Sequence, residues 1–188
     1  GQLLIELPTL YEQMDHSYNI FADLNYYLTE KLRVNAGIRY THQKKDFSLL
    51  SDNSGRQTLD NVEKWNLWGG RFGLDYQFTD DLMAYASFAR GFKSGGFNGR
   101  AASIYAIGPF DEETVNAYEM GFKSDLLGKR VRLNVAGFLN DYKDLQVDQL
   151  LDVALPGGGT SQETVIANAA KARIYGAEVE LLAVPAPG

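Results

Sequence analysis

The chain has 188 residues, a net charge of −6 and a sequence pI near 4.9, with 45% hydrophobic and 22% charged residues. Because phosphate recognition needs a basic surface, this acidic balance argues against a nucleic-acid partner. The absence of cysteine excludes disulfides, thiol nucleophiles and cysteine metal sites. No apolar run approaches the roughly 18 residues of a membrane helix, whereas a membrane strand needs only about 10 residues of alternating character.

Taken in chain order, the sequence alternates repeatedly between apolar and polar residues, which is the period of a strand with one apolar face. The segments that show this alternation are residues 16–28, 32–44, 64–78, 131–139 and 175–181. Residues 114–124 alternate less cleanly, and the sequence does not assign the faces of residues 82–92. We therefore predict about seven long strands.

The connections between these segments alternate in length. Tight turns are predicted at residues 29–31, 79–81 and 127–129, and long polar or glycine-rich loops at residues 47–63, 94–113 and 150–163. Short turns at one end and long loops at the other are typical of a membrane barrel, with its short periplasmic turns and longer extracellular loops.

Several segments resemble the barrel strands of TonB-dependent receptors. The longest match is YASFARGFKSGGFN at residues 85–98. Further matches lie at residues 21–26, 37–40, 112–114, 118–123, 136–146 and 175–180, together with Asn168. Each match is short, but they follow the order of the family over about residues 18–182, and this ordered series carries the resemblance.

The resemblance implies an all-β fold, an antiparallel up-and-down meander of about seven long strands that is part of a 22-stranded transmembrane β-barrel. It implies that residues 1–188 form a partial barrel domain without the plug domain of the family. The expected location is the bacterial outer membrane, and the expected activity is TonB-dependent uptake of a scarce ligand, most often a ferric siderophore or another iron complex. The implied partners are the lipid bilayer and lipopolysaccharide, the receptor's own plug domain, the TonB complex and the iron-complex ligand.

Charged residues on the polar strand faces are candidates to line the lumen of such a barrel. They are Arg33, Arg39, Arg71, Asp75, Glu119, Lys123, Arg132, Glu178 and Glu180. The alternative for these residues is the solvated face of a soluble sheet. Tyr105 and Phe110, in the second long loop, are candidates for contacting an apolar or aromatic ligand.

No pattern predicts catalysis, a cofactor or a metal site. The sequence has no H-E-x-x-H, G-x-S-x-G or Walker pattern. His16 and His42 lie at strand positions, and Gly157, Gly158 and Gly159 indicate a loop tip because no helix pattern follows them. Glu178 and Glu180 share one strand face, which a polar barrel wall explains without acid–base chemistry.

Two other functional classes stay open on the sequence. One is a small, complete outer-membrane barrel of structural or passive-pore type, which would need an even number of strands, about eight, in a closed ring. The other is a soluble all-β binding module or enzyme.

Overall fold

The computed structural model describes residues 10–51, 57–99, 101, 104–154 and 158–184. They form one seven-stranded antiparallel sheet in which each strand pairs with the next along the chain. The strands are β1 (Leu10–Tyr27), β2 (Leu32–Ser51), β3 (Gln57–Thr79), β4 (Leu82–Lys93), β5 (Glu113–Leu126), β6 (Val131–Ala154) and β7 (Thr160–Ala183). The predicted meander of about seven long strands is confirmed.

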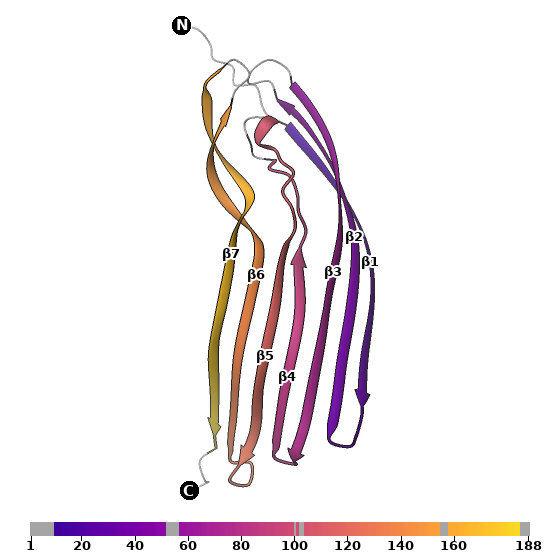
Figure 1. Ribbon diagram of the computed structural model, residues 1–188, viewed down its shortest axis with the longest axis vertical. Coiled ribbons are helices and arrows are strands. Elements are labelled where there is room, and N and C mark those ends of the chain that lie inside the picture. The colour runs from indigo at the N-terminus through magenta and orange to yellow at the C-terminus, as the bar shows by residue number, and fades with distance from the viewer. Residues whose placement is uncertain (1–9, 52–56, 100, 102–103, 155–157, 185–188) are drawn as a thin grey trace.

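The sheet is long and gently curved, with its tight hairpins at one end and its longer connections at the other (Figure 1). We call these the hairpin end and the loop end. The predicted tight turns join β1 to β2, β3 to β4 and β5 to β6 at the hairpin end. In the first, the Thr29 hydroxyl accepts hydrogen bonds from the backbone N–H groups of Lys31 and Leu32. In the third, Gly128 has φ +65° and supplies the left-handed backbone that a tight turn requires.

Two of the three predicted long loops are wrong in their extent. Strand β2 continues to Ser51 and β3 begins at Gln57, so most of residues 47–63 is paired sheet. Likewise β6 runs to Ala154 and β7 starts at Thr160 within the predicted loop 150–163. Only residues 94–112 form a long connection in the described part of the chain, with the short 3₁₀ helix η1 (Ile104–Ala106) inside it.

The register defines two faces that run unbroken across all seven strands, because residues directly opposite each other in an antiparallel pair point to the same side. One row of opposite residues consists of Tyr26, Val34, Leu74, Ala86, Met120, Gly137 and Ala177. The row on the other side consists of Asn25, Asn35, Gly73, Ser87, Glu119, Phe138 and Gly176. We call these sides the apolar face and the polar face. The register also assigns β4: Ala84, Ala86 and Phe88 belong to the apolar face, and Tyr85 and Ser87 to the polar face.

A packed core lies at the loop end. It lies on the same side of the sheet as the polar face. It comprises Phe47, Leu49, Trp65, Leu67, Phe97, Ala101, Ala106, Ile107 and Val165. The β4–β5 connection covers this part of the sheet with Phe97 and Ile107. Beneath them lie Phe47 and Leu49 of β2 and Trp65 and Leu67 of β3. Because these strand residues have the parity of the polar face, the sequence there loses the alternation seen lower in the sheet. In the described part of the chain, no helix is both long and apolar enough to cross a membrane.

Gly95 tests the packing of this connection. A Cβ atom at Gly95 would collide with the backbone oxygen of Phe110 and with Nε1 of Trp65. We expect Gly95→Ala to destabilise the folded protein by about 1–3 kcal/mol, the usual cost of overpacking. The measurement is the urea midpoint of unfolding.

Gly137→Ala is the matched control, because its Cβ would meet nothing closer than the Gly176 oxygen at 3.9 Å. Equal midpoints for the two variants would contradict the packing described for the connection.

Candidate functional site

All nine charged residues predicted from the sequence lie on the polar face of the sheet. The register places Arg33 opposite Asp75, and Glu178 beside Ala136 in the same row as Tyr85. Side chains on neighbouring strands of this face are therefore close enough to pair. That the face lines a lumen stays a prediction.

Ion pairs bridge the first three strands on this face. Arg33 Nη2 lies 2.7 Å from Asp75 Oδ2, and the Arg33 Nε–H donates to the same oxygen at 2.8 Å. Arg71 of β3 reaches over β2 to Asp23 of β1, with Nη2 2.8 Å from Oδ1. Gly37 lies between these two partners, and a Cβ there would come within 2.5 Å of Asp23 Oδ1. The glycine therefore leaves the room that this longer ion pair needs.

The same face carries mixed polar contacts over the later strands. The Tyr85 hydroxyl donates to Glu119 at 2.6 Å, and Lys123 Nζ lies 5.7 Å from the centre of the Tyr85 ring. The Asn134 amide donates to Glu180 at 2.7 Å. Arg132 pairs with Asp125 at 2.8 Å, close to the β5–β6 hairpin. Each strand from β4 to β7 is thus linked to a neighbour through side chains.

Arg39 is held in a separate group nearer the loop end. Its Nη2 donates to the side-chain Oδ1 of Asn19 at 2.8 Å, and its Nε donates to the Thr41 hydroxyl at 3.2 Å. The guanidinium carbon also lies 5.8 Å from the centre of the Phe92 ring. Arg39 therefore joins the polar wall to the packed core of the loop end.

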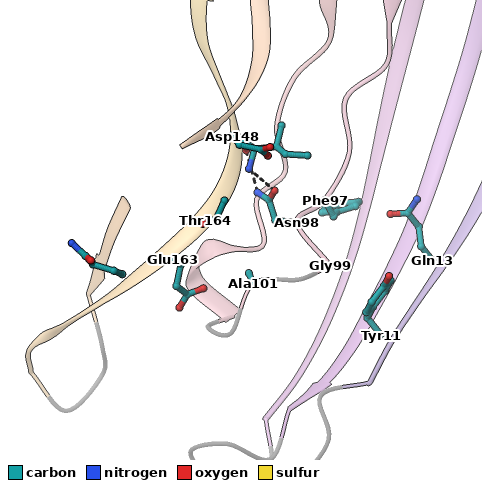
Figure 2. Close-up of a pocket in the computed structure, with 11 residues that line it drawn as sticks. Tyr11, Gln13, Phe97, Asn98, Gly99, Ala101, Asp148, Glu163 and Thr164 are labelled. Atoms are coloured by element: carbon teal, nitrogen blue, oxygen red, sulfur yellow. Dashed lines mark hydrogen bonds between the residues drawn. The ribbon is translucent and has the colours of Figure 1, made fainter. Parts of the chain in front are cut away.

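A cavity of about 690 Å³ opens beside the packed core at the loop end. Figure 2 shows Tyr11 and Gln13 on one side of it, Glu163 and Thr164 on the other, and Phe97 and Asn98 between them. Its lining comes from β1, from the β4–β5 connection and from Asp148, Gln162, Glu163, Thr164 and Ile166 of β6 and β7. Segments that are more than 100 residues apart in the chain therefore build one concavity.

Aromatic stacking supports one wall of this cavity. The Tyr11 ring stacks on Phe47 with centroids 6.1 Å apart, and Phe47 stacks on Phe97 at 5.1 Å. Tyr11 is about half exposed, whereas Phe97 is buried. The cavity thus presents an aromatic surface beside carboxylate and amide groups, which suits a ligand with both apolar and polar parts.

Neither predicted loop contact lines the cavity. Tyr105 lies in η1 with 59% of its surface exposed, and Phe110 pairs with Gly96 through a backbone bridge. Their contact with a ligand stays a prediction. Sequence reasoning did not single out Tyr11, Phe97 or Asn98 as site residues. Tyr11 lies on β1, and Phe97 and Asn98 reach the same cavity only through the fold of the β4–β5 connection.

The two histidines lie beside other polar residues of the sheet. His42 Nδ1 lies 2.9 Å from Asn66 Oδ1, and His16 pairs in register with Lys44. Within the residues that the structure describes, no group of three or more His, Asp or Glu side chains is placed to hold a metal ion. Gly158 and Gly159 lie in the turn between β6 and β7, and Gly157 lies outside the described residues.

Comparison with known sequences identifies one family. The sequence profile described as TonB dependent receptor-like, beta-barrel matches residues 9–184. The Pesticin receptor of Yersinia enterocolitica is 29% identical over 172 residues, which cover 89% of this chain and 24% of that protein. The Metal-pseudopaline receptor CntO of Pseudomonas aeruginosa is 29% identical over 111 residues, 58% of this chain and 15% of that protein. The chain thus spans about a quarter or less of the length of these relatives.

Solved structures show the same fold. The ferric yersiniabactin uptake receptor FyuA from Yersinia pestis superposes with a TM-score of 0.78 at 24% identity, covering 96% of this chain and 26% of that one. The closed form of the Ferric-Catecholate import receptor Fiu from E. coli K12 gives a TM-score of 0.66 at 21% identity, covering 94% of this chain and 26% of that one.

Removal of the Asp75 carboxylate tests whether the ion pairs of the polar face contribute to stability. Asp75→Ala takes away the partner of Arg33 and an acceptor for the Asn35 amide. We expect a loss of about 1 kcal/mol in unfolding free energy, because the pair is partly exposed to solvent. Asp80→Ala is the control, since Asp80 lies in a hairpin turn and its side chain makes no hydrogen bond or ion pair among the described residues. The unfolding free energy of both variants is measured by urea titration. Equal losses for Asp75→Ala and Asp80→Ala would show that the contacts of Asp75 on the polar face contribute nothing to stability.

Proposed function

The chain belongs to the TonB-dependent receptor-like β-barrel family of the bacterial outer membrane, and we propose that it forms part of the wall and external rim of a receptor that imports an iron complex. Members of this family are transport receptors and not enzymes. The receptor would bind its ligand on the outer side and pass it through the barrel without bond chemistry. The observation that carries the proposal is the continuous two-faced sheet with a ligand-sized cavity at one end.

The apolar face has the height of an outer-membrane barrel. Its side chains on β3 run from Trp68 to Phe78, about 33 Å along a strand that rises about 3.3 Å per residue. With a strand tilt of about 40°, this corresponds to a band about 25 Å tall. Above the band the same face turns polar, with Arg90 beside Asn116 and Arg173 paired to Asp141. Tyr40 and Trp68, in ring contact at 4.7 Å, lie at this boundary, where aromatic side chains suit a membrane interface.

The ends of the sheet give the orientation. Short hairpins of outer-membrane barrels face the periplasm and longer connections face outward. The β4–β5 connection and the 690 Å³ cavity therefore lie on the external side, where a ligand arrives. That volume lies within the range of about 300–1,000 Å³ that is usual for small-molecule sites.

The iron complex is inferred from the relatives and from the chemistry of the cavity. Two solved relatives are named for uptake of ferric yersiniabactin and of ferric catecholate, and a third relative is named a metal-pseudopaline receptor. The half-exposed Tyr11 offers a ring surface to an organic chelator, while the exposed Gln13 and Thr164 offer hydrogen-bonding groups.

The polar face would point into the barrel lumen, toward the plug domain of a longer receptor of which residues 1–188 form a partial barrel domain. Its ion pairs would line the wall around the plug, while the apolar face contacts the bilayer and lipopolysaccharide. Energy for uptake would come through the TonB complex. These partners follow from the family and would engage parts of the receptor beyond this chain.

The two other functional classes have less support. A small closed barrel requires β1 to pair on both of its edges, whereas the described part of β1 pairs with β2 alone. A soluble binding module does not account for the exposed Ile20, Trp68, Met120 and Val179, which lie on one continuous face.

Uptake of labelled iron tests the proposal. The complete receptor is expressed in a bacterium that lacks receptors of its own for the probes, which are ⁵⁵Fe-labelled ferric yersiniabactin and a ⁵⁵Fe-labelled ferric catecholate. We expect uptake of at least one probe, and its loss when TonB is deleted.

We further expect Tyr11→Ala to weaken binding of the imported probe about tenfold, because an aromatic anchor of the cavity is removed.

Tyr26→Ala is the matched control, because Tyr26 lies on the apolar face at the hairpin end and should leave binding unchanged. Absence of uptake for both probes, or uptake that does not depend on TonB, would overturn the proposal.

A further inference from the structure

The β4–β5 connection is joined to the β6–β7 hairpin by the side chain of Asn98. Its Oδ1 accepts the Ile166 N–H at 2.7 Å, and its Nδ2 donates to the Ile166 carbonyl oxygen at 3.2 Å. The same Nδ2 donates to the Ala106 oxygen at 3.2 Å, inside the connection. Asn98 is buried, with 8% of its surface exposed. One amide therefore satisfies both backbone groups of Ile166, as a neighbouring strand would.

Asn168 makes the same contact in the opposite direction. Its Oδ1 accepts the Asp111 N–H at 2.6 Å, and its Nδ2 donates to the Asp111 oxygen at 2.9 Å. Nδ2 also donates to the Asp144 oxygen at 2.8 Å, where β6 has a bulge and Asp144 has φ +55°. An asparagine of the connection thus hydrogen-bonds to the backbone of the hairpin, and an asparagine of the hairpin hydrogen-bonds to the backbone of the connection.

Gln146 strengthens the second contact. Its Nε2 donates to the Ser94 oxygen at 2.9 Å and to the Asp111 oxygen at 3.0 Å, so Asp111 is held from both β6 and β7. Ser94 and Asp111 lie near the two ends of the connection. Both of its ends, and Asn98 between them, are therefore held to the hairpin by side-chain hydrogen bonds.

We propose that Asn98 and Asn168 are positioning residues that form a reciprocal clasp, which holds the β4–β5 connection and the β6–β7 hairpin together as one unit before any ligand binds. Asn98 and Ile166 both line the cavity, so the clasp sets the spacing of two of its walls. The meaning of this for transport rests on the proposed function, because only then is the cavity a ligand site. A wall formed in advance lowers the ordering cost of binding.

The clasp predicts a coupling that packing alone does not. The buried Phe97 and Ile107 hold the connection against β2 and β3, but they do not link Ile166 to Asp111. If the two asparagines act as one device, release of Asn98 loosens the contact that Asn168 makes. If they act separately, each substitution affects only its own backbone partner.

Hydrogen exchange of the ligand-free complete receptor in lipid tests this coupling. In the wild type we expect slow exchange at the Ile166 and Asp111 amides. Asn98→Ala should speed exchange at Ile166 at least tenfold, and also at Asp111, although the Asn168 side chain remains. Asn168→Ala should have the reciprocal effect at Ile166. Asn140→Ala is the control and should change neither, because the Asn140 side chain makes no hydrogen bond among the described residues.

Exchange at Met120, in the middle of β5, reports whether each variant keeps its fold and should not change. Should Asn98→Ala fail to assemble, Asn168→Ala gives the same test from the less buried side of the clasp. Unchanged exchange at the distant partner, with Met120 protected, would overturn the proposal. Since no ligand is present, that failure would leave the transport function standing, and a failure of iron uptake would leave the clasp standing.

Discussion

The structure depends on strand register. Side chains alternate with a period of two, so a slip of one residue between neighbouring strands would exchange the apolar and polar faces of every residue beyond it. Here one register runs from β1 to β7, and the rows through Leu74 and through Gly73 each cross the whole sheet without changing side. In a membrane this order is obligatory, because lipid offers no hydrogen bonds to backbone groups, and a charge on the lipid side is costly.

The polar face changes character from the hairpin end to the loop end, and this change creates the candidate site. In the lower sheet it carries ion pairs such as Arg33–Asp75 and Arg71–Asp23, which suit contact with water or another polar surface. Toward the loop end the same parity carries Phe47 and Trp65, which the β4–β5 connection covers. Ion pairs thus stabilise the polar face toward the hairpin end, and apolar packing stabilises it toward the loop end. The cavity opens beside this packed region.

Alternation was sufficient to predict the strands and the faces of every strand except β4, and the tight-turn residues predicted the hairpins. Alternation was insufficient at the loop end, because apolar residues there also occur at the parity of the polar face. Residues 47–63 have, in addition, the composition of a loop, although most of them are paired. The faces of β4 needed its partners, since Tyr85 is placed only by its position opposite Asp75 and Gly121. Asn98 and Asn168 fall within the family matches, but nothing in the sequence pairs either of them with its backbone partner, because these partners lie 68 and 57 residues away, respectively.

The most direct test of the central claim is the environment of alternate residues on β3. Single cysteines at positions 72, 74 and 76, and at 71, 75 and 77, can carry spin labels in the complete receptor reconstituted in lipid, and collisions with oxygen report contact with the hydrocarbon core. We predict high oxygen accessibility at Phe72, Leu74 and Tyr76 and low accessibility at Arg71, Asp75 and Gln77. Accessibility that does not alternate, or that is higher at the odd positions, would contradict the assignment of the apolar face to lipid.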